Sequence, residues 1–405
     1  MNTIHLWPED LQERDGQIRL PARLELDSGR QETLWYEVPE RYEGTLTDDA
    51  DHFVVALALR MAQERRPVRV HGRVSPSLLK NLEKYLGIWS SWKPERYSLV
   101  EIVADDERDR ELPSGPAQAV CGFSGGVDSS FTAYRHARAV TTRFPEPLTA
   151  GILVQGFDIP MDENIMFSNA FAKARQQLDS LGLELIPVAT NFRSLDLDWT
   201  QTFATGVASV MMLLGGRFSR GLIALGAPVG QYGMKVVGSN PLTDPLLSSN
   251  AFRIIPDGAA FGRPEKIRAI ADWPEAMEML RVCWEGYHKD RNCCECEKCI
   301  RTILSFRSLG LGLPPCFDRD VTDTQILALK SLHEFKIAIG YEPIVQMADA
   351  EGKNDESWVG ALRKAIVMNR RRRRNAKIPI LRRLPGVKRR LKRILSLRKD
   401  ASLQS

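Results

Sequence analysis

Hydrophobic and polar residues follow a mixed pattern in the first quarter of the chain. Stretches that alternate apolar and polar residues, as in a strand, are interspersed with stretches whose apolar residues recur every three to four positions, as in a helix. The expected strands are 18–26, 34–38, 68–71 and 98–104, and the expected helices are 52–64 and 76–86. This mixture predicts an N-terminal α+β domain over residues 1–112.

From residue 117 the pattern becomes a regular succession of strand and helix. After a first strand at 119–123, buried-looking strands are expected at 148–154, 184–189 and 221–225, with helices at 129–138, 163–181 and 200–214. Such a succession is typical of a doubly wound, mainly parallel α/β sheet of Rossmann-like type. We expect this domain to cover residues 117–317 and to bind its ligand at the carboxyl ends of the strands.

The last part of the chain is strongly basic. Residues 318–362 are expected to form a helical extension, and residues 363–405 a basic tail with 17 Lys and Arg residues against a single acidic residue, Asp400. The tail thus carries +16, whereas the whole chain carries +5 and its remainder −11. A solvated tail, contact with RNA and contact with an anionic membrane surface all remain open. Within the tail, apolar residues recur at helical spacing between arginines and lysines, although Pro379 and Pro385 break any single long helix: Leu381, Leu384, Val387, Leu391 and Ile394.

Composition indicates a cytoplasmic protein. No stretch approaches the roughly 18 consecutive apolar residues of a membrane-spanning helix, and residues 1–14 lack the apolar core of a signal peptide. Four of the seven cysteines lie between Cys293 and Cys299. This clustering favours metal binding in a reducing compartment over a secreted disulfide framework.

A glycine-rich loop stands between the first strand of the α/β domain and the helix that follows it. Residues 124–129 read Ser-Gly-Gly-Val-Asp-Ser. Two glycines and a short hydroxyl side chain let backbone N–H groups approach an anion, and the following helix adds the positive end of its dipole. The loop lacks the Gly-Lys-Ser/Thr ending of a Walker loop, so it does not hold a γ-phosphate through that lysine.

The cysteines predict a metal site. Cys283, Cys293, Cys296 and Cys299 have the spacing of thiolates that converge on one tetrahedral ion, and four such ligands leave no open position. We therefore expect a structural Zn²⁺ site, with an iron–sulfur cluster as the alternative. Cys294 is the least suitable ligand, because Cys293 already keeps the two-residue spacing.

The loop and the late cysteine group together resemble a known superfamily. The string Ser-Gly-Gly-Val-Asp-Ser resembles the pyrophosphate loop of the N-type ATP pyrophosphatases, the adenine nucleotide alpha hydrolase superfamily. The cysteines, followed by Ile300 and Arg301, resemble the 7-cyano-7-deazaguanine synthase (QueC-like) branch over residues 117–317. That branch's Gly-Tyr-Pro-Asp-Cys-Arg substrate segment is absent, and residues 226–246 stand in its place.

The resemblance implies roles for individual residues. Asp128 would orient Mg²⁺ or the loop itself, and Gln155 and Phe157 would lie near the adenine or ribose of ATP. The pyrophosphate would be held by the loop residues Ser124, Gly125, Gly126, Val127 and Ser129.

Three further residues are candidates for the same site. Gly226 ends a strand, where the missing side chain would let a nucleotide approach, although a plain turn explains it equally. Asp244 precedes a proline in a polar loop and is a candidate catalytic residue or an ordinary turn residue. Lys266 follows Gly262 in an expected helix and, by the resemblance, would contact phosphate, unless it lies on a solvated helix face.

These residues predict an ATP-dependent, AMP-forming ligase. By the resemblance, a carboxylate or carbonyl of a small-molecule acceptor becomes an AMP adduct, pyrophosphate leaves, and ammonia or another nitrogen donor then forms a C–N bond. The expected cofactors are ATP, Mg²⁺ and Zn²⁺. The alternatives are a tRNA- or sugar-modifying amidotransferase of the same superfamily and a non-catalytic nucleotide-sensing or RNA-binding protein.

Overall fold

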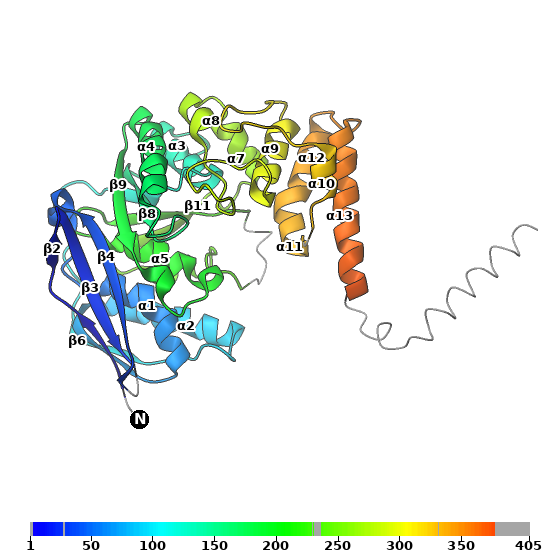
Figure 1. Ribbon diagram of the computed structural model, residues 1–405. Coiled ribbons are helices and arrows are strands. Elements are labelled where there is room, and N and C mark those ends of the chain that lie inside the picture. The colour runs from blue at the N-terminus through cyan, green and yellow to red at the C-terminus, as the bar shows by residue number, and fades with distance from the viewer. Residues whose placement is uncertain (1–2, 27–28, 229, 231–235, 331, 377–405) are drawn as a thin grey trace, which may run out of the picture.

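A computed structural model describes residues 3–26, 29–228, 230, 236–330 and 332–376, and these residues build one eleven-stranded sheet (Figure 1). The order across the sheet is β11-β10-β7-β8-β9-β4-β3-β1-β5-β6, and β2 pairs with β3. The strands are β1 (Ile4–Pro8), β2 (Gln12–Arg14), β3 (Gln17–Glu25), β4 (Gln31–Pro39), β5 (Val68–Val74), β6 (Ile102–Glu107), β7 (Ala119–Gly122), β8 (Leu148–Gln155), β9 (Glu184–Thr190), β10 (Arg220–Ala224) and β11 (Arg253–Asp257).

The half of the sheet from β11 to β9 is parallel throughout. The chain enters it at β7, continues to β8 and β9 on one side, and later adds β10 and β11 on the other side of β7. The predicted mainly parallel α/β sheet is therefore confirmed. The direction of winding reverses between β7 and β10, which is the position where open α/β sheets bind their ligands.

The N-terminal strands continue this sheet. Strand β4 pairs antiparallel with β9, with Tyr36 opposite Thr190 and Glu37 opposite Ala189. Beyond β4, β3 and β1 are antiparallel neighbours, and β5 and β6 follow in parallel. The change of pattern near residue 112 thus separates two halves of one sheet.

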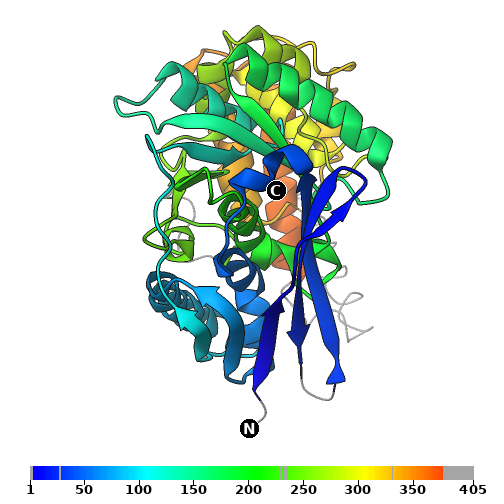
Figure 2. The same ribbon diagram turned by 90° about the vertical axis from the view of Figure 1, so that its left-hand side faces the viewer.

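Helices cover both faces of the sheet (Figures 1 and 2). In both views the N-terminal α1 and α2 lie below α3 and α4, and α5 lies beside α1. The helices are α1 (Asp51–Glu64), α2 (Pro76–Trp92), α3 (Val127–Arg138), α4 (Asn164–Ser180), α5 (Trp199–Leu213), α7 (Arg263–Ile270), α8 (Pro274–Met279), α9 (Glu297–Ser308), α10 (Asp323–Leu327), α11 (Glu334–Lys336), α12 (Glu342–Ala350) and α13 (Ser357–Ala376). Shorter turns are η2 (Glu40–Thr45), η3 (Phe192–Ser194), η4 (Asp244–Leu247) and the π-helical η5 (Ile337–Tyr341).

Two large hydrophobic cores lie against the sheet. The first combines side chains of α1 and α2 with those of α5, and Tyr36 of β4 donates a buried hydrogen bond of 2.8 Å to Ser209 of α5. The second joins α3 and α4 to α7, α9, α12 and α13. Residues 1–112 and the α/β part therefore share a core as well as a sheet.

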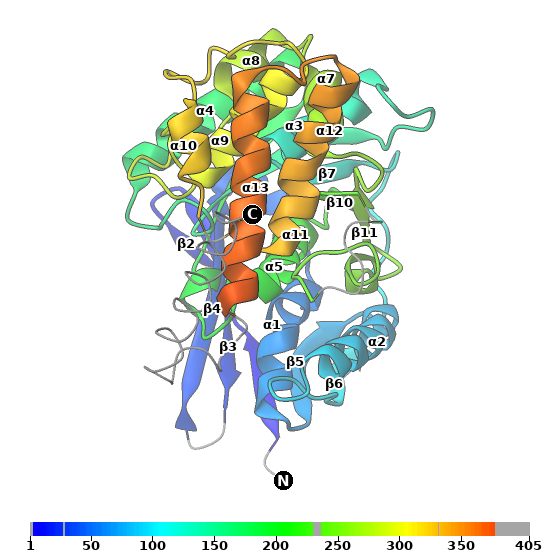
Figure 3. The same ribbon diagram turned by 90° about the vertical axis from the view of Figure 1, so that its right-hand side faces the viewer.

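The C-terminal helices stack beside the α/β part (Figure 3). Helix α13 begins in the expected helical extension and crosses residue 363, the expected start of the basic tail. Trp358, Leu362 and Ile366 of α13 are buried in the second core. Residues 377–405, which include the apolar positions between Leu381 and Ile394, lie outside the described residues.

None of the described helices combines the length and the apolar character that crossing a bilayer requires.

Candidate functional site

The Ser-Gly-Gly-Val-Asp-Ser loop connects β7 to α3 at the point where the winding of the sheet reverses. Gly125 has a φ of +72°, a left-handed conformation that a side chain disfavours. Gly126 is the N-cap of α3 and lacks a side-chain cap, so the helix start presents backbone N–H groups as an anion site requires. The hydroxyls of Ser124 and Ser129 lie 3.3 Å apart.

Two cations hold the loop's aspartate. Lys266 Nζ lies 2.9 Å from Asp128 Oδ1, and Arg263 Nη2 lies 3.0 Å from Asp128 Oδ2. Both cations come from the start of α7 and are almost completely buried, and Lys266 also donates to the carbonyl oxygen of Leu225 at the end of β10. The structure thus places Lys266 and Arg263 against the same carboxylate, whereas the sequence analysis expected Lys266 to contact phosphate.

The charge of Asp128 is fixed by this environment. Burial alone would raise the pKa of its carboxyl, but the positive charges of Lys266 and Arg263 outweigh burial and lower that pKa below its usual value. Asp128 is therefore ionised at neutral pH.

A cavity of about 380 Å³ opens over the loop. Ser124, Asp128 and Ser129 line its polar end together with Asp158, which follows β8. Its other end is apolar, and Phe157 contributes to a wall of aromatic rings there, with centroids 4.9 Å from Phe157 to Trp199 and 6.2 Å from Trp199 to Phe203. A cavity with polar and apolar parts of this kind suits a ligand that has an anionic group and a flat apolar ring.

Two predicted site residues support the chain itself, and a third lies near the loop. Gln155 donates through Nε2 to Met161 O at 3.1 Å and to Asn164 Oδ1 at 2.8 Å, which braces the turn between β8 and α4. Val127 is buried in the second core. Gly226 lies near the site, since a Cβ added there would stand 4.0 Å from Asp128 Oδ2.

Asp244 lies apart from the loop. It is fully buried in η4, where it accepts hydrogen bonds from Ser239 Oγ at 2.6 Å and from the backbone N–H of Asn240 at 3.0 Å. Burial raises the pKa of Asp244 to about 7. Asp244 is not among the described residues that line the cavity, so its prediction as a substrate-facing residue finds no geometric support.

Two basic residues that line the cavity were missed by the sequence analysis. Arg281 and Lys298 both reach the cavity that contains Ser124 and Asp128. Both lie far from the loop in sequence; Arg281 belongs to no recognisable motif, and Lys298 lies within the cysteine motif without being one of its ligands. Their nearness to the predicted cysteine ligands was the only signal available.

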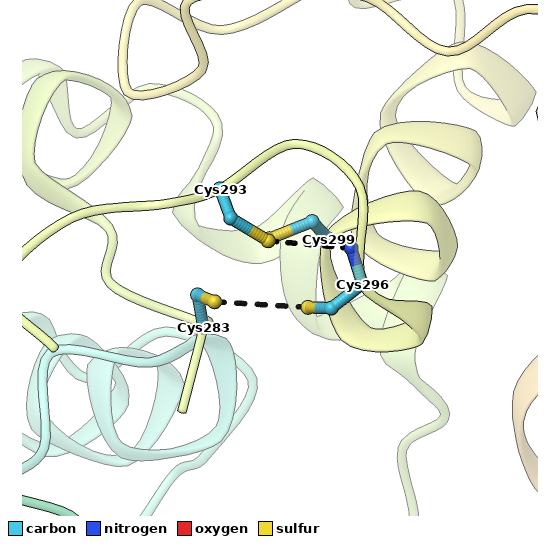
Figure 4. Close-up of side chains that lie close together, drawn as sticks. All are labelled: Cys283, Cys293, Cys296 and Cys299. Atoms are coloured by element: carbon cyan, nitrogen blue, oxygen red, sulfur yellow. Dashed lines mark hydrogen bonds between the residues drawn. The ribbon is translucent and has the colours of Figure 1, made fainter. Parts of the chain in front are cut away.

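The four predicted cysteines come together (Figure 4). All four Sγ atoms lie within 4.8 Å of one another, with 3.7 Å between Cys283 and Cys296 and 3.9 Å between Cys293 and Cys299. The backbone N–H groups of Gly286 and Cys296 point at sulfur atoms, each at 3.3 Å. Convergent sulfur atoms with N–H donors fit a soft metal ion.

Cys294 points away from this cluster. Its backbone has a φ of +62°, and its Sγ lies 3.9 Å from the carbonyl oxygen of Asn292. The cluster of Cys283, Cys293, Cys296 and Cys299 can therefore hold one metal ion, and this set is compatible with Zn²⁺.

Comparisons of this chain with protein-family models, with curated proteins and with solved structures find no match.

Proposed function

We propose that the protein is an ATP-dependent ligase that activates an acceptor carboxylate or carbonyl as an AMP adduct and then attaches a nitrogen nucleophile. The observation that carries this proposal is the position of the loop from Ser124 to Ser129, which lies at the winding reversal and opens onto a cavity with one polar and one apolar end. The loop's resemblance to the pyrophosphate loop of the N-type ATP pyrophosphatases supports the same reaction.

In this reaction an acceptor oxygen attacks the α-phosphorus of ATP. The bond from that phosphorus to the bridging oxygen breaks, and pyrophosphate leaves with the bonding electrons. The loop N–H groups and the hydroxyls of Ser124 and Ser129 would bind the leaving pyrophosphate. Ammonia, or another nitrogen donor, then attacks the activated carbon, and AMP departs.

The charged residues in and beside the cavity have separate tasks in this proposal. Lys266 and Arg263 hold Asp128 ionised, which keeps the loop in register with the end of β10. Carboxylate oxygens suit Mg²⁺, and Asp128 or Asp158 would hold that ion beside the phosphates. When bound, Mg²⁺ would neutralise the negative charge that develops on the leaving pyrophosphate. The aromatic wall would take the flat base of the nucleotide.

The decisive experiment follows the phosphates. ATP labelled in the α-phosphate should yield labelled AMP when the acceptor and ammonia are present. Gly126→Val should abolish ATP binding, because a Cβ at this position would already lie 3.3 Å from Ser124 Oγ and 3.5 Å from the carbonyl oxygen of Arg281. Gly87→Ala, in a helix position with open space, is the matched control. Release of ADP and phosphate, together with normal turnover by Gly126→Val, would refute the proposal.

A nucleotide-binding protein without turnover is the second candidate. One observation favours it, since both carboxylate oxygens of Asp128 are already bonded to cations of the chain. This candidate predicts ATP binding at the same loop without AMP formation. A screen of acceptor pools, with AMP and pyrophosphate measured together, separates the two candidates.

A further inference from the structure

The cysteine cluster places two cations in the cavity. Arg281 precedes Cys283 by two residues, and Lys298 stands between Cys296 and Cys299 in the first turn of α9. Both line the cavity beside Ser124 and Asp128. The candidate metal ligands and these two cavity-lining cations therefore lie on the same short segments of the chain.

Arg281 clamps the loop to the cysteine segment. Its Nη2 donates to the carbonyl oxygen of Ser124 at 2.9 Å, and its backbone N–H donates to the carbonyl oxygen of Gly125 at 2.8 Å. Its Nη1 donates to the carbonyl oxygen of Lys289 at 3.0 Å, on the stretch that leads to Cys293. One buried side chain thus connects both sides of the site.

The side chain of Asn292 joins the segment that contains Cys283 to the segment that leads to Cys293. This buried side chain precedes Cys293, and its Oδ1 accepts from the backbone N–H of Val282 at 2.9 Å and of Cys283 at 3.3 Å. Its Nδ2 donates to the carbonyl oxygens of Leu280 at 2.8 Å and Cys316 at 2.9 Å. A displacement of Cys293 would therefore be passed directly to the backbone beside Arg281.

Lys298 forms no ion pair with a carboxylate of the described residues. It is partly buried, and the negative charges of Asp158 and Asp128 act on its ammonium group from beyond ion-pair distance. Its Nζ instead lies 5.6 Å from the centre of the Trp284 ring. An ammonium group that faces a cavity under these conditions is suited to an anionic ligand. Lys266 differs from Lys298 in this respect, because its Nζ already forms an ion pair with Asp128.

We propose that metal binding by the cysteine cluster sets the affinity of the cavity for phosphate groups, with Lys298 as a direct phosphate ligand and Arg281 as the positioning residue of the loop. Four thiolates bound to one ion fix both ends of the segment between Cys283 and Cys299. Without the ion, these sulfur atoms no longer fix Arg281 and Lys298 relative to the loop. The inference rests on the phosphate site of the proposed function and is independent of AMP formation.

The role of Lys298 is tested with inorganic pyrophosphate as the probe, by calorimetry on the full zinc-loaded chain. Lys298→Met should weaken pyrophosphate binding about tenfold or more, because it removes one charged hydrogen bond while keeping all four cysteines. Lys298→Arg should restore part of the affinity. Lys364→Met, at an exposed position of α13, is the control. Equal affinity of Lys298→Met and wild type would overturn the role of Lys298.

The coupling is tested in the reverse direction, because linkage is reciprocal. Saturating pyrophosphate should tighten zinc binding, measured at equilibrium by competition with a coloured chelator, about tenfold in the wild type and markedly less in Lys298→Met and Arg281→Met. Because pyrophosphate itself binds zinc, and does so equally in every sample, the two variants also show how much of the change is due to that binding. Identical zinc affinities with and without pyrophosphate in the wild type would overturn the coupling. A protein that passes this test but forms no AMP would refute only the proposed ligase reaction.

Discussion

At the scale of single residues, Asp128 shows how a buried group is kept ionised within the glycine-rich loop at the start of α3. Its carboxylate would be costly to desolvate alone, and the ion pairs with Lys266 and Arg263 offset that cost. The same pairs keep the two cations from lying buried without a counter-charge. The three charges sum to +1, so removal of Asp128 would leave two largely buried cations without a counter-charge.

Asp128→Asn should therefore lower the free energy of unfolding at pH 7 by about 3 kcal/mol or more, because Lys266 and Arg263 lose their partner. The pKa of Asp128 is lower in the folded state than in the unfolded state, so its stabilising contribution is present above the unfolded pKa. It is lost as the pH falls from about 4 towards the folded pKa. Denaturant unfolding measured from pH 7 to pH 2 should show a shallower decline for the variant, and parallel curves would contradict this account.

The sequence identified the two glycines of the loop. They were found because adjacent glycines between a strand and a helix indicate a special backbone, and Gly125 does adopt a left-handed φ. Arg281 and Lys298 were missed, since their place in the cavity depends on how distant segments pack. Asp244, in contrast, has a residue type that catalysis uses, but it satisfies hydrogen bonds inside η4.

At the scale of elements, the cysteine cluster is a knuckle joined to a helix. Cys296 is the N-cap of α9, so that the last ligand, Cys299, lies one turn into the helix. The left-handed backbone at Cys294 turns the chain between Cys293 and Cys296. Ligand geometry therefore depends on both the tight turn and the start of α9.

Cys296→Ser should lose the metal and lower thermal stability, because three remaining thiolates bind Zn²⁺ less tightly than four. Cys294→Ser is the matched control and should keep the metal, since its sulfur points away from the cluster. Metal analysis of protein purified without chelator should give about one zinc per chain for the wild type and for Cys294→Ser. A coloured iron chromophore, or equal metal loss in both variants, would contradict the assignment.

The pattern of apolar residues predicted the long elements well. The expected helices 163–181 and 200–214 correspond closely to α4 and α5, because their periodicity is long and ends at glycines. The short strands β1, β2 and β11 were not predicted, since three to five residues carry little periodicity. Helix α2 continues to Trp92, beyond the expected end at residue 86, because buried Trp89 packs into the first core.

At the scale of the whole molecule, charge is divided along the chain between an acidic body and a basic C-terminal part. Helix α13 carries the beginning of this basic part, with Arg371, Arg372, Arg373 and Arg374 exposed. Arg370 instead pairs with Glu334 and Glu342 and so fastens α13 to its neighbours. The basic region thus begins on a packed helix.

Truncation after Ala376 should weaken salt-sensitive binding to RNA or anionic vesicles while leaving ATP binding intact, because it removes ten of the seventeen cations and leaves α13 whole. Binding measured between 50 and 300 mM salt should show a smaller salt dependence for the shortened chain. Truncation after Ser357 is unsuitable, since it removes the buried side chains of α13. Unchanged polyanion binding after Ala376 would exclude residues 377–405 from this role.

The pairing of β4 with β9 has a consequence for the order in which the protein folds. Tyr36 and Thr190 are neighbours in the sheet although 153 residues separate them in the chain, so this junction closes only after β9 has been synthesised. Until then β4 is an unpaired edge, and its row of free backbone groups can pair with other chains. An isolated N-terminal fragment of residues 1–112 should accordingly aggregate, whereas in the full chain β9 covers that edge.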